Sequence, residues 1–146
     1  MRAEGTFKVQ DFTPAAVAPT LTVKTGVDVG VATMEKSFDG GFAGRSATLF
    51  TAAFDQATGT GTYVAMESFE GSLNGVEGTF NFAHTASTTG SDRTDAHFLV
   101  VPGSGTAGLT GISGTGELTV DADGTHRVWI EYVLPQEASP GGSRTQ

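Results

Sequence analysis

The chain has 146 residues, of which 38% are hydrophobic and 16% charged, a composition typical of one globular domain. Sixteen acidic against eight basic residues give a formal net charge of −8, so the sequence lacks the basic surface that nucleic acids and anionic membranes require. Cysteine is absent, which excludes disulfide bonds and thiol catalysis. No apolar run resembles a secretory signal or is long enough to span a bilayer. We therefore expect a cytoplasmic protein without nucleic-acid or membrane partners.

Eight β-strands are expected in chain order, because alternating apolar and polar residues recur between short turn sequences. The expected strands cover residues 5–12, 27–38, 45–54, 62–69, 78–87, 95–101, 115–121 and 126–134. The segments DGG, DQATGTG, LNGVEG, TTGSD and DADG between them have turn chemistry. A proline-containing loop over residues 13–26 is expected to cross the sheet or to cover one end of it.

An antiparallel meander of eight strands can close on itself, which removes the exposed sheet edges. We therefore expect an all-β fold, an eight-stranded antiparallel β-barrel, as a single domain over residues 1–135 with a disordered tail over residues 136–146. The segments FDGGFAG (38–44) and FEGSLNG (69–75) share the pattern aromatic-x-Gly-x-apolar-x-Gly and are expected at hairpin tips. A barrel of this size holds either its own side chains or one small ligand.

The stretch VPGSGTAGLTGISGTG (101–116) contains a literal G-x-G-x-x-G at Gly103, Gly105 and Gly108. A phosphate-binding loop of this kind needs a following helix whose N-terminus faces the pyrophosphate. Three more glycines follow within eight residues, and each costs a helix about 1 kcal/mol relative to alanine. The run is therefore interpreted as a connection between two strands, and no cofactor is expected.

Period-two alternation indicates which side chains face the interior. On strand 78–87, Phe80, Phe82 and His84 share a face opposite small polar residues, so this face is expected inside. Strand 62–69 has two candidate core faces, which carry Tyr63, Glu67 and Phe69 or Val64 and Met66. Which of these two faces lies inside is left open.

If the aromatic face of strand 62–69 lies inside, Glu67 lies near His84 on the neighbouring strand. Burial in an apolar interior would raise the pKa of the carboxyl, and the imidazole could hold or relay its proton. Such a pair suits acid–base chemistry. Two structural explanations stand beside this one. Glu67 could lie in solvent at the barrel rim, with His84 as a hydrogen-bonded core histidine, or Glu67 could form a rim salt bridge with Lys36.

The remaining histidines and the tryptophan are not expected to form a site. His84, His97 and His126 lie on three strands without the local spacing of metal ligands, so no metal site is expected. If Phe98 faces inward, the three imidazoles cannot meet. Trp129 is expected outside, where it would mark an oligomer interface or lie under the proline-containing loop.

The strings FLVVPGSGTAGLTGISGTGEL, YVAMESFEGSLNGVEGTFNFAHTAS and AEGTFKV resemble the bacterial DUF3224 family over nearly the whole chain, from Arg2 to about Leu134. The resemblance implies a small antiparallel β-barrel related in fold to allene oxide cyclase. That enzyme binds a hydrophobic epoxide in its barrel and steers the rearrangement by shape and a few polar groups. Its catalytic residues do not map one by one onto this sequence, so none is carried over.

Residues and resemblance together suggest a cofactor-free isomerase or cyclase that binds a hydrophobic small molecule, with Glu67 and His84 as proton-handling groups. The expected lining consists of Met34, Tyr63, Phe69, Phe80, Phe82 and Tyr132. One alternative is a non-catalytic carrier or sensor for the same kind of ligand. Another is a filled barrel that acts through its surface or as a homo-oligomer. A cavity of a few hundred Å³ with a polar group in its wall would favour the small-molecule functions.

Overall fold

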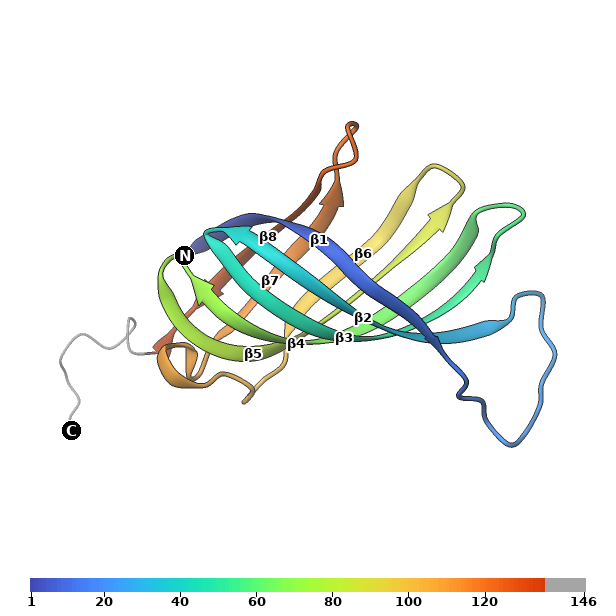
Figure 1. Cartoon of the computed structure of the whole chain (residues 1–146), viewed down its shortest axis with the longest axis horizontal. Helices are drawn as coiled ribbons and strands as arrows, with labels where there is room; N and C mark the ends of the chain where they lie inside the picture. The colour runs from blue at the N-terminus through green and yellow to red at the C-terminus, as the bar shows by residue number, and fades with distance from the viewer. Residues whose placement is uncertain (136–146) are drawn as a thin grey trace.

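The computed structural model describes residues 1–135. This part of the chain contains β1 (Arg2–Ala15), β2 (Val29–Gly40), β3 (Phe42–Asp55), β4 (Thr60–Leu73), β5 (Val76–Thr89), β6 (Arg93–Val100), the 3₁₀ helix η1 (Ala107–Leu109), β7 (Ser113–Val120) and β8 (His126–Val133). Each strand pairs antiparallel with the next, and β8 pairs back with β1, so the strands form one closed ring (Figure 1). The predicted all-β fold with eight antiparallel strands is confirmed. The predicted tail over 136–146 lies outside the described residues.

Several strands extend beyond their predicted ends, because glycines predicted for turns are paired within the sheet. Gly44, Gly71 and Gly78 are direct neighbours across β3, β4 and β5. A Cβ on Gly71 would lie 2.0 Å from the carbonyl oxygen of Ala43, so this close approach requires glycine. The two repeated segments do lie at hairpin tips, where the β2–β3 and β4–β5 turns contain glycines of positive φ, Gly40 and Gly75.

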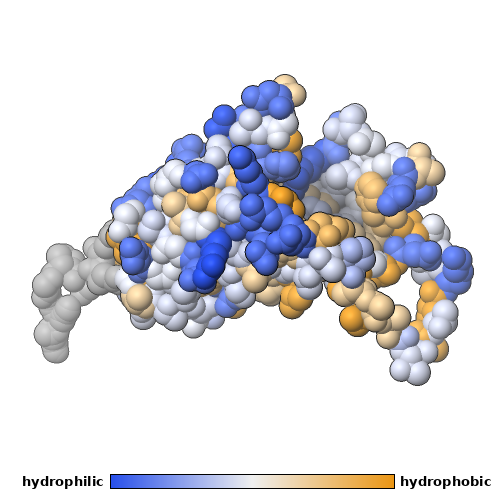
Figure 2. Space-filling model, viewed as in Figure 1, coloured by the Kyte–Doolittle hydropathy of each residue, from blue (hydrophilic) through white to orange (hydrophobic). Residues whose placement is uncertain are grey.

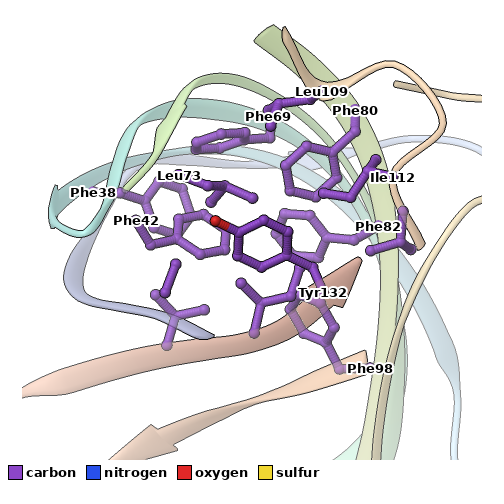
Figure 3. Packing of buried hydrophobic residues seen from close by; sticks show 14 of the residues in the cluster. Phe38, Phe42, Phe69, Leu73, Phe80, Phe82, Phe98, Leu109, Ile112 and Tyr132 are labelled. Carbon is purple, nitrogen blue, oxygen red and sulfur yellow. The ribbon is translucent and has the colours of Figure 1, made fainter. Parts of the chain in front are cut away.

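One end of the ring is filled by side chains. Phenylalanines from β2 to β6 pack there against aliphatic residues of β8 and the β6–β7 connection, as Figure 3 shows. Members of this hydrophobic cluster include Phe7, Phe38, Phe42, Phe69, Phe80, Phe82, Phe98, Leu73, Ile130 and Tyr132. The aromatic rings contact one another closely, with centroids 4.8 Å apart for Phe42 and Phe69 and 4.6 Å apart for Phe82 and Phe98. This end of the ring therefore supplies the core of the domain.

The glycine-rich run forms the connection between β6 and β7, as predicted. Its backbone hydrogen-bonds to Thr79 and Asn81 of β5, which continues the sheet where β6 has ended. The helix η1 has three residues and places Leu109, which is fully buried, against the hydrophobic cluster. A Cβ on Gly105 would lie 2.0 Å from the carbonyl oxygen of Leu109, so this glycine serves close packing. The run closes the filled end of the ring.

The opposite end of the ring is more open. The loop between β1 and β2 extends beyond the strand ends there (Figure 1), and hydrophobic residues gather on the same side of the surface (Figure 2). Phe12, Val29 and Phe54 near this end are between 46% and 72% exposed. Within residues 1–135, the structure holds no helix that is long and apolar enough to cross a membrane.

Candidate functional site

A layer of buried polar side chains lies next to the filled end. It consists of Lys36 from β2, Ser46 and Thr48 from β3, Glu67 from β4 and His84 from β5. Each occupies a position of the same parity as the inward phenylalanine of its strand region, so period-two alternation turns all five inward. The aromatic face of β4 is thus the inner one, and Glu67 and His84 both point inward.

Glu67 is the centre of this layer and is fully buried. The hydroxyl of Ser46 donates to Oε1 of Glu67 at 2.7 Å. Nε2 of His84 lies 2.5 Å from Oε2, which also forms an ion pair with the ammonium group of Lys36. Three donors therefore hold a carboxylate that has no access to water. We call these residues, with the two introduced next, the Glu67 network.

The network continues from His84 towards the open end. Nδ1 of His84 lies 2.7 Å from the hydroxyl of Tyr63, and a guanidinium nitrogen of Arg93 donates to that hydroxyl at 2.6 Å. The arrangement is satisfied by one tautomer, in which Nε2–H donates to Glu67 and Nδ1 accepts from Tyr63. Glu67, His84, Tyr63 and Arg93 therefore form one hydrogen-bonded chain from the interior to the surface.

The acid–base properties of Glu67 differ from the expectation. Burial would raise the pKa of its carboxyl, but the hydrogen bond from His84 and the charge of Lys36 outweigh burial and lower the pKa from 4.5 to about 2. The predicted raised pKa is wrong, because the sequence did not reveal how many donors surround the group. The rim location is also wrong. The Lys36–Glu67 ion pair does exist, but it is buried.

Burial also shifts the two groups that lead towards the surface. It lowers the pKa of His84, with the charge of Lys36 acting in the same direction and the hydrogen bond to Glu67 opposing it. The imidazole is therefore neutral at neutral pH. Burial raises the pKa of Tyr63, and the nearby charge of Arg93 opposes this change. Tyr63 consequently keeps its proton, which can bond to Nδ1 of His84.

Two cavities lie beside the network. The first cavity has a volume of about 570 Å³ and is mainly apolar; its lining includes Phe12, Val29, Phe50, Ala52, Tyr63 and Ala86. The second cavity has a volume of about 170 Å³; its lining includes Lys36, Thr48, Phe50, Tyr63, His84 and Arg93. Phe50 and Tyr63 line both cavities, and their rings stack with centroids 5.4 Å apart. The two cavities are therefore neighbours that share one aromatic wall.

The structure divides the predicted lining residues into two groups. Met34 lines the second cavity, and Tyr63 lines both. The other four belong to the hydrophobic cluster at the filled end and line neither cavity: Phe69, Phe80, Phe82 and Tyr132. Sequence alternation placed Phe80, Phe82 and Tyr132 inside correctly and left the face of Phe69 open. It could not show which end of the ring is filled.

Of the two predicted proton-handling residues, His84 lines the second cavity, whereas Glu67 lines neither cavity and lies behind it. Glu67 can therefore act on a ligand only through its neighbours. A catalytic role for either residue stays a prediction.

Sequence reasoning missed four residues of the site. Ser46, Thr48 and Phe50 alternate along β3, so the same period that revealed the face of β5 could have revealed them. No alternation pattern in the sequence pointed to Arg93. The pairing of β5 with β6 shifts register between Thr85 and Ser87, and this irregularity decides where Arg93 lies. Only the assembled sheet places it against Tyr63.

No hydrogen bond joins the side chain of His97, His126 or Trp129 to the network in the described part of the chain. Phe98 faces inward and His97 outward, so the three imidazoles do not gather. His126 lines the second cavity, beside the ring of Phe7. Trp129 is partly exposed, and the guanidinium of Arg2 lies 4.3 Å from its ring centroid. Of the two alternatives given for Trp129, the oligomer interface stays a prediction, and Arg2 of β1 supplies a cover that the proline-containing loop could have given.

The geometry defines a class of small all-β domain: a closed antiparallel ring with one packed end, one open end and a buried ionic network between them. The chain belongs to the DUF3224 family, described as "Protein of unknown function (DUF3224)", whose model matches residues 3–132. The predicted family resemblance is thereby confirmed.

A solved structure is similar to this chain over almost its whole length. It is the crystal structure of a protein with unknown function from the DUF3224 family of Shewanella oneidensis MR-1. The two share 30% sequence identity with a TM-score of 0.78, over 92% of this chain and 96% of the other. No curated protein matches the chain. These matches support the fold and the family, and they name no activity.

Proposed function

We propose that this protein is a β-barrel of the allene oxide cyclase type that binds a hydrophobic small molecule and isomerises or cyclises it without a cofactor. One observation carries the proposal. Tyr63 stands in the wall of a mainly apolar cavity of about 570 Å³ and is hydrogen-bonded to an inward imidazole. Cavities of this size and character are typical of small-molecule sites, in which a few polar groups fix the orientation of the ligand.

In the proposed reaction, Tyr63 and His84 move the proton. The oxygen of Tyr63 takes a proton from one carbon of the substrate while its own proton passes to Nδ1 of the neutral imidazole. The reverse transfer returns a proton to a second carbon, so the product is an isomer and no oxidant or reductant is consumed. The transfer leaves the substrate negatively charged and the imidazole positively charged, and the guanidinium of Arg93, which is hydrogen-bonded to Tyr63, stabilises the negative charge.

Glu67 is a positioning residue in this proposal. Its carboxylate holds Nε2–H of His84, which leaves Nδ1 as the acceptor that faces Tyr63. It also stabilises the imidazolium that forms when His84 takes the proton. The apolar wall of the first cavity supplies the remaining rate enhancement, because holding a flexible substrate in a reactive conformation can lower the activation free energy by several kcal/mol.

A carrier or sensor is the second candidate function. Glu67 accepts hydrogen bonds from three side chains, and both ring nitrogens of His84 have partners. A network in which every group is paired is also what a purely structural role requires. The same cavity would then hold a ligand without converting it.

Ligand binding is tested with the neutral fluorophore N-phenyl-1-naphthylamine. We expect its emission to rise on binding, and Ala52→Trp, which fills the first cavity, to weaken binding by roughly tenfold or more. Leu49→Trp is the matched control, because Leu49 lies on the same strand and is 64% exposed on the outer face. Equal binding by both variants, or none by the unmodified protein, would exclude the first cavity as the site.

Catalysis is tested by NMR in D₂O with a panel of neutral medium-chain enones and epoxides. Conversion or deuterium incorporation should fall roughly 100-fold or more in Tyr63→Phe and in His84→Gln, the usual effect of losing an acid–base group. Fluorophore binding should persist in both variants. Unchanged turnover would remove the acid–base assignment. Fluorophore binding without conversion of any panel member would favour the carrier.

A further inference from the structure

The second cavity has an unusual charge character for this protein. Four side chains that are cationic or able to become so contribute to its lining: Lys36, His84, Arg93 and His126. No aspartate or glutamate contributes to it, although the chain as a whole carries a formal charge of −8. The first cavity has no such excess of cationic groups, because its one charged lining residue, Asp28, is ion-paired with Lys24 at 3.4 Å. An anionic group would therefore be attracted to the second cavity rather than to the first.

One of these positive charges is not compensated. Lys36 is neutralised by its ion pair with Glu67, and the lowered pKa of His84 keeps its imidazole uncharged at neutral pH. Within residues 1–135, the guanidinium of Arg93 has no carboxylate within ion-pair distance; the hydroxyl of Tyr63 accepts a hydrogen bond from it. The Glu67 network, which includes Arg93, thus has a net charge of one positive unit.

A second, independent observation points to a missing polar partner at the same place. Thr48 lines the second cavity and is 3% exposed. Its hydroxyl is buried and has no hydrogen-bond partner among the described residues. Buried hydroxyl groups almost always have a partner, so the environment of Thr48 lacks an acceptor that a ligand could supply.

We propose that the second cavity binds the carboxylate of an amphipathic monocarboxylate whose apolar body fills the first cavity. Phe50 and Tyr63 line both cavities, so one ligand can extend from one to the other. The inference rests on the proposed ligand site and adds the chemical class of the ligand. Arg93 and Thr48 donate to the carboxylate oxygens.

The charge balance favours a carboxylate over a phosphate. A carboxylate carries one negative charge and matches the single uncompensated positive charge, and it fits the planar fork of a guanidinium. A phosphate monoester carries between one and two negative charges at neutral pH, so it would leave part of its charge unpaired in a small cavity. The volume of about 170 Å³ accommodates a head group but not a long chain as well.

The test compares decanoate with decanol as competitors of N-phenyl-1-naphthylamine, at neutral pH and below the micelle concentration. The two competitors share one alkyl chain and differ in the head group. We expect decanoate to compete roughly tenfold more effectively, the usual effect of a charge-assisted hydrogen bond. Arg93→Gln should abolish this preference, and Thr48→Val should reduce it without weakening decanol.

Arg45→Gln serves as the charge-matched control, because the side chain of Arg45 is 76% exposed and Arg45 is absent from the lining of both cavities. Equal competition by decanoate and decanol would overturn the carboxylate site and leave the proposed function intact. A preference that survives in Arg93→Gln would overturn it as well. If the fluorophore itself does not bind, the proposed function fails instead, so the two failures are distinguishable.

Discussion

At the scale of single residues, the buried carboxylate of Glu67 organises the interior. Removing an acid from water is costly, and here the cost is offset by an ammonium, a hydroxyl and an imidazole at hydrogen-bond distance. The partners come from three other strands, and Lys36 lies 31 residues from Glu67 in sequence. The ion pair therefore depends on correct pairing of β2, β3 and β4, and breaking it should lower the free energy of unfolding.

A double-mutant cycle on Lys36 and Glu67 tests this coupling. Lys36→Met keeps the apolar stem but leaves the carboxylate without its charge partner, so we expect the free energy of unfolding to fall by about 3 kcal/mol. The double variant Lys36→Met/Glu67→Gln should lose clearly less than the sum of the two single variants. Urea denaturation measures all four proteins. Additive losses would contradict a coupled buried pair.

The shifted pKa values predict how stability depends on pH. The pKa of His84 is lowered from 6.5, so below about pH 6.5 the unfolded chain binds a proton that the folded chain resists. The pKa of Glu67 is lowered from 4.5 to about 2. Between about pH 4.5 and pH 2 the unfolded chain therefore binds a proton at Glu67 that the folded chain does not bind. Both effects reduce the free energy of unfolding as pH falls, and Glu67 contributes on the order of 3 kcal/mol.

Urea denaturation at a series of pH values from about 2 to above 6.5 measures the free energy of unfolding and checks the prediction. In Glu67→Gln the loss of stability below pH 4.5 should be smaller than in the unmodified protein. Glu77→Gln is the control, because it makes the same change of side chain at an exposed position on the neighbouring strand. Identical pH profiles for all three proteins would show that the carboxyl of Glu67 is not stabilised in its charged form.

At the scale of elements, the strands approach one another most closely where glycines replace side chains. The row of Gly44, Gly71 and Gly78 crosses three strands near the filled end. Each glycine would bring its added Cβ within 2.3 Å of a backbone carbonyl oxygen. The predicted hairpin turns are present, and these glycines form a tightly paired part of the sheet beside them.

Gly71→Ala should disturb this pairing. The new Cβ would meet the carbonyl oxygen of Ala43 at 2.0 Å, so one strand must move, and we expect a loss of at least about 1 kcal/mol of stability. Gly30→Ala on β2 is the control, because a Cβ there meets no atom within 4 Å. Thermal unfolding followed by circular dichroism compares the two. A loss in Gly30→Ala that equals the loss in Gly71→Ala would contradict the packing explanation.

At the scale of the whole molecule, the ring is divided along its length into three parts. The filled end carries the hydrophobic cluster, the Glu67 network lies in the middle, and the first cavity opens at the other end. The hydrophobic cluster and the proposed ligand site therefore lie at different ends of the ring. If the proposal holds, substitutions at the ligand site should leave the core intact.

The division predicts opposite effects for two phenylalanines. Phe69 is 1% exposed within the cluster, so Phe69→Ala should cost about 3 to 5 kcal/mol of stability. Phe12 is 55% exposed and lines the first cavity, so Phe12→Ala should change stability by less than about 1 kcal/mol and weaken N-phenyl-1-naphthylamine binding. Denaturation and fluorescence titration measure both. Weaker binding to folded Phe69→Ala than to Phe12→Ala would contradict the division.

The candidate site was predictable only in part. His84 and Glu67 were found because alternation turns both side chains to the inner face of adjacent strands, and their separation across the β4–β5 pair is short. The lining was assigned less well. Phe69, Phe80 and Tyr132 fill space, because they lie on the side of Glu67 away from the cavities. Alternation indicates whether a side chain points into the ring or out of it. It does not indicate how far along the ring axis the side chain lies.

The number of strands, their antiparallel order and the inward faces of β5 and β8 follow from the amino-acid sequence, because turn chemistry and period-two alternation are local properties. The sequence also shows that the glycine run lacks the helix that a phosphate site needs. The filled end, the contacts of Lys36 and Ser46 with Glu67, and the contact of Arg93 with Tyr63 become visible only in the folded chain. The stagger and the register shifts of the strands set the position of each side chain along the ring axis. Both depend on how all eight strands pair in the closed ring.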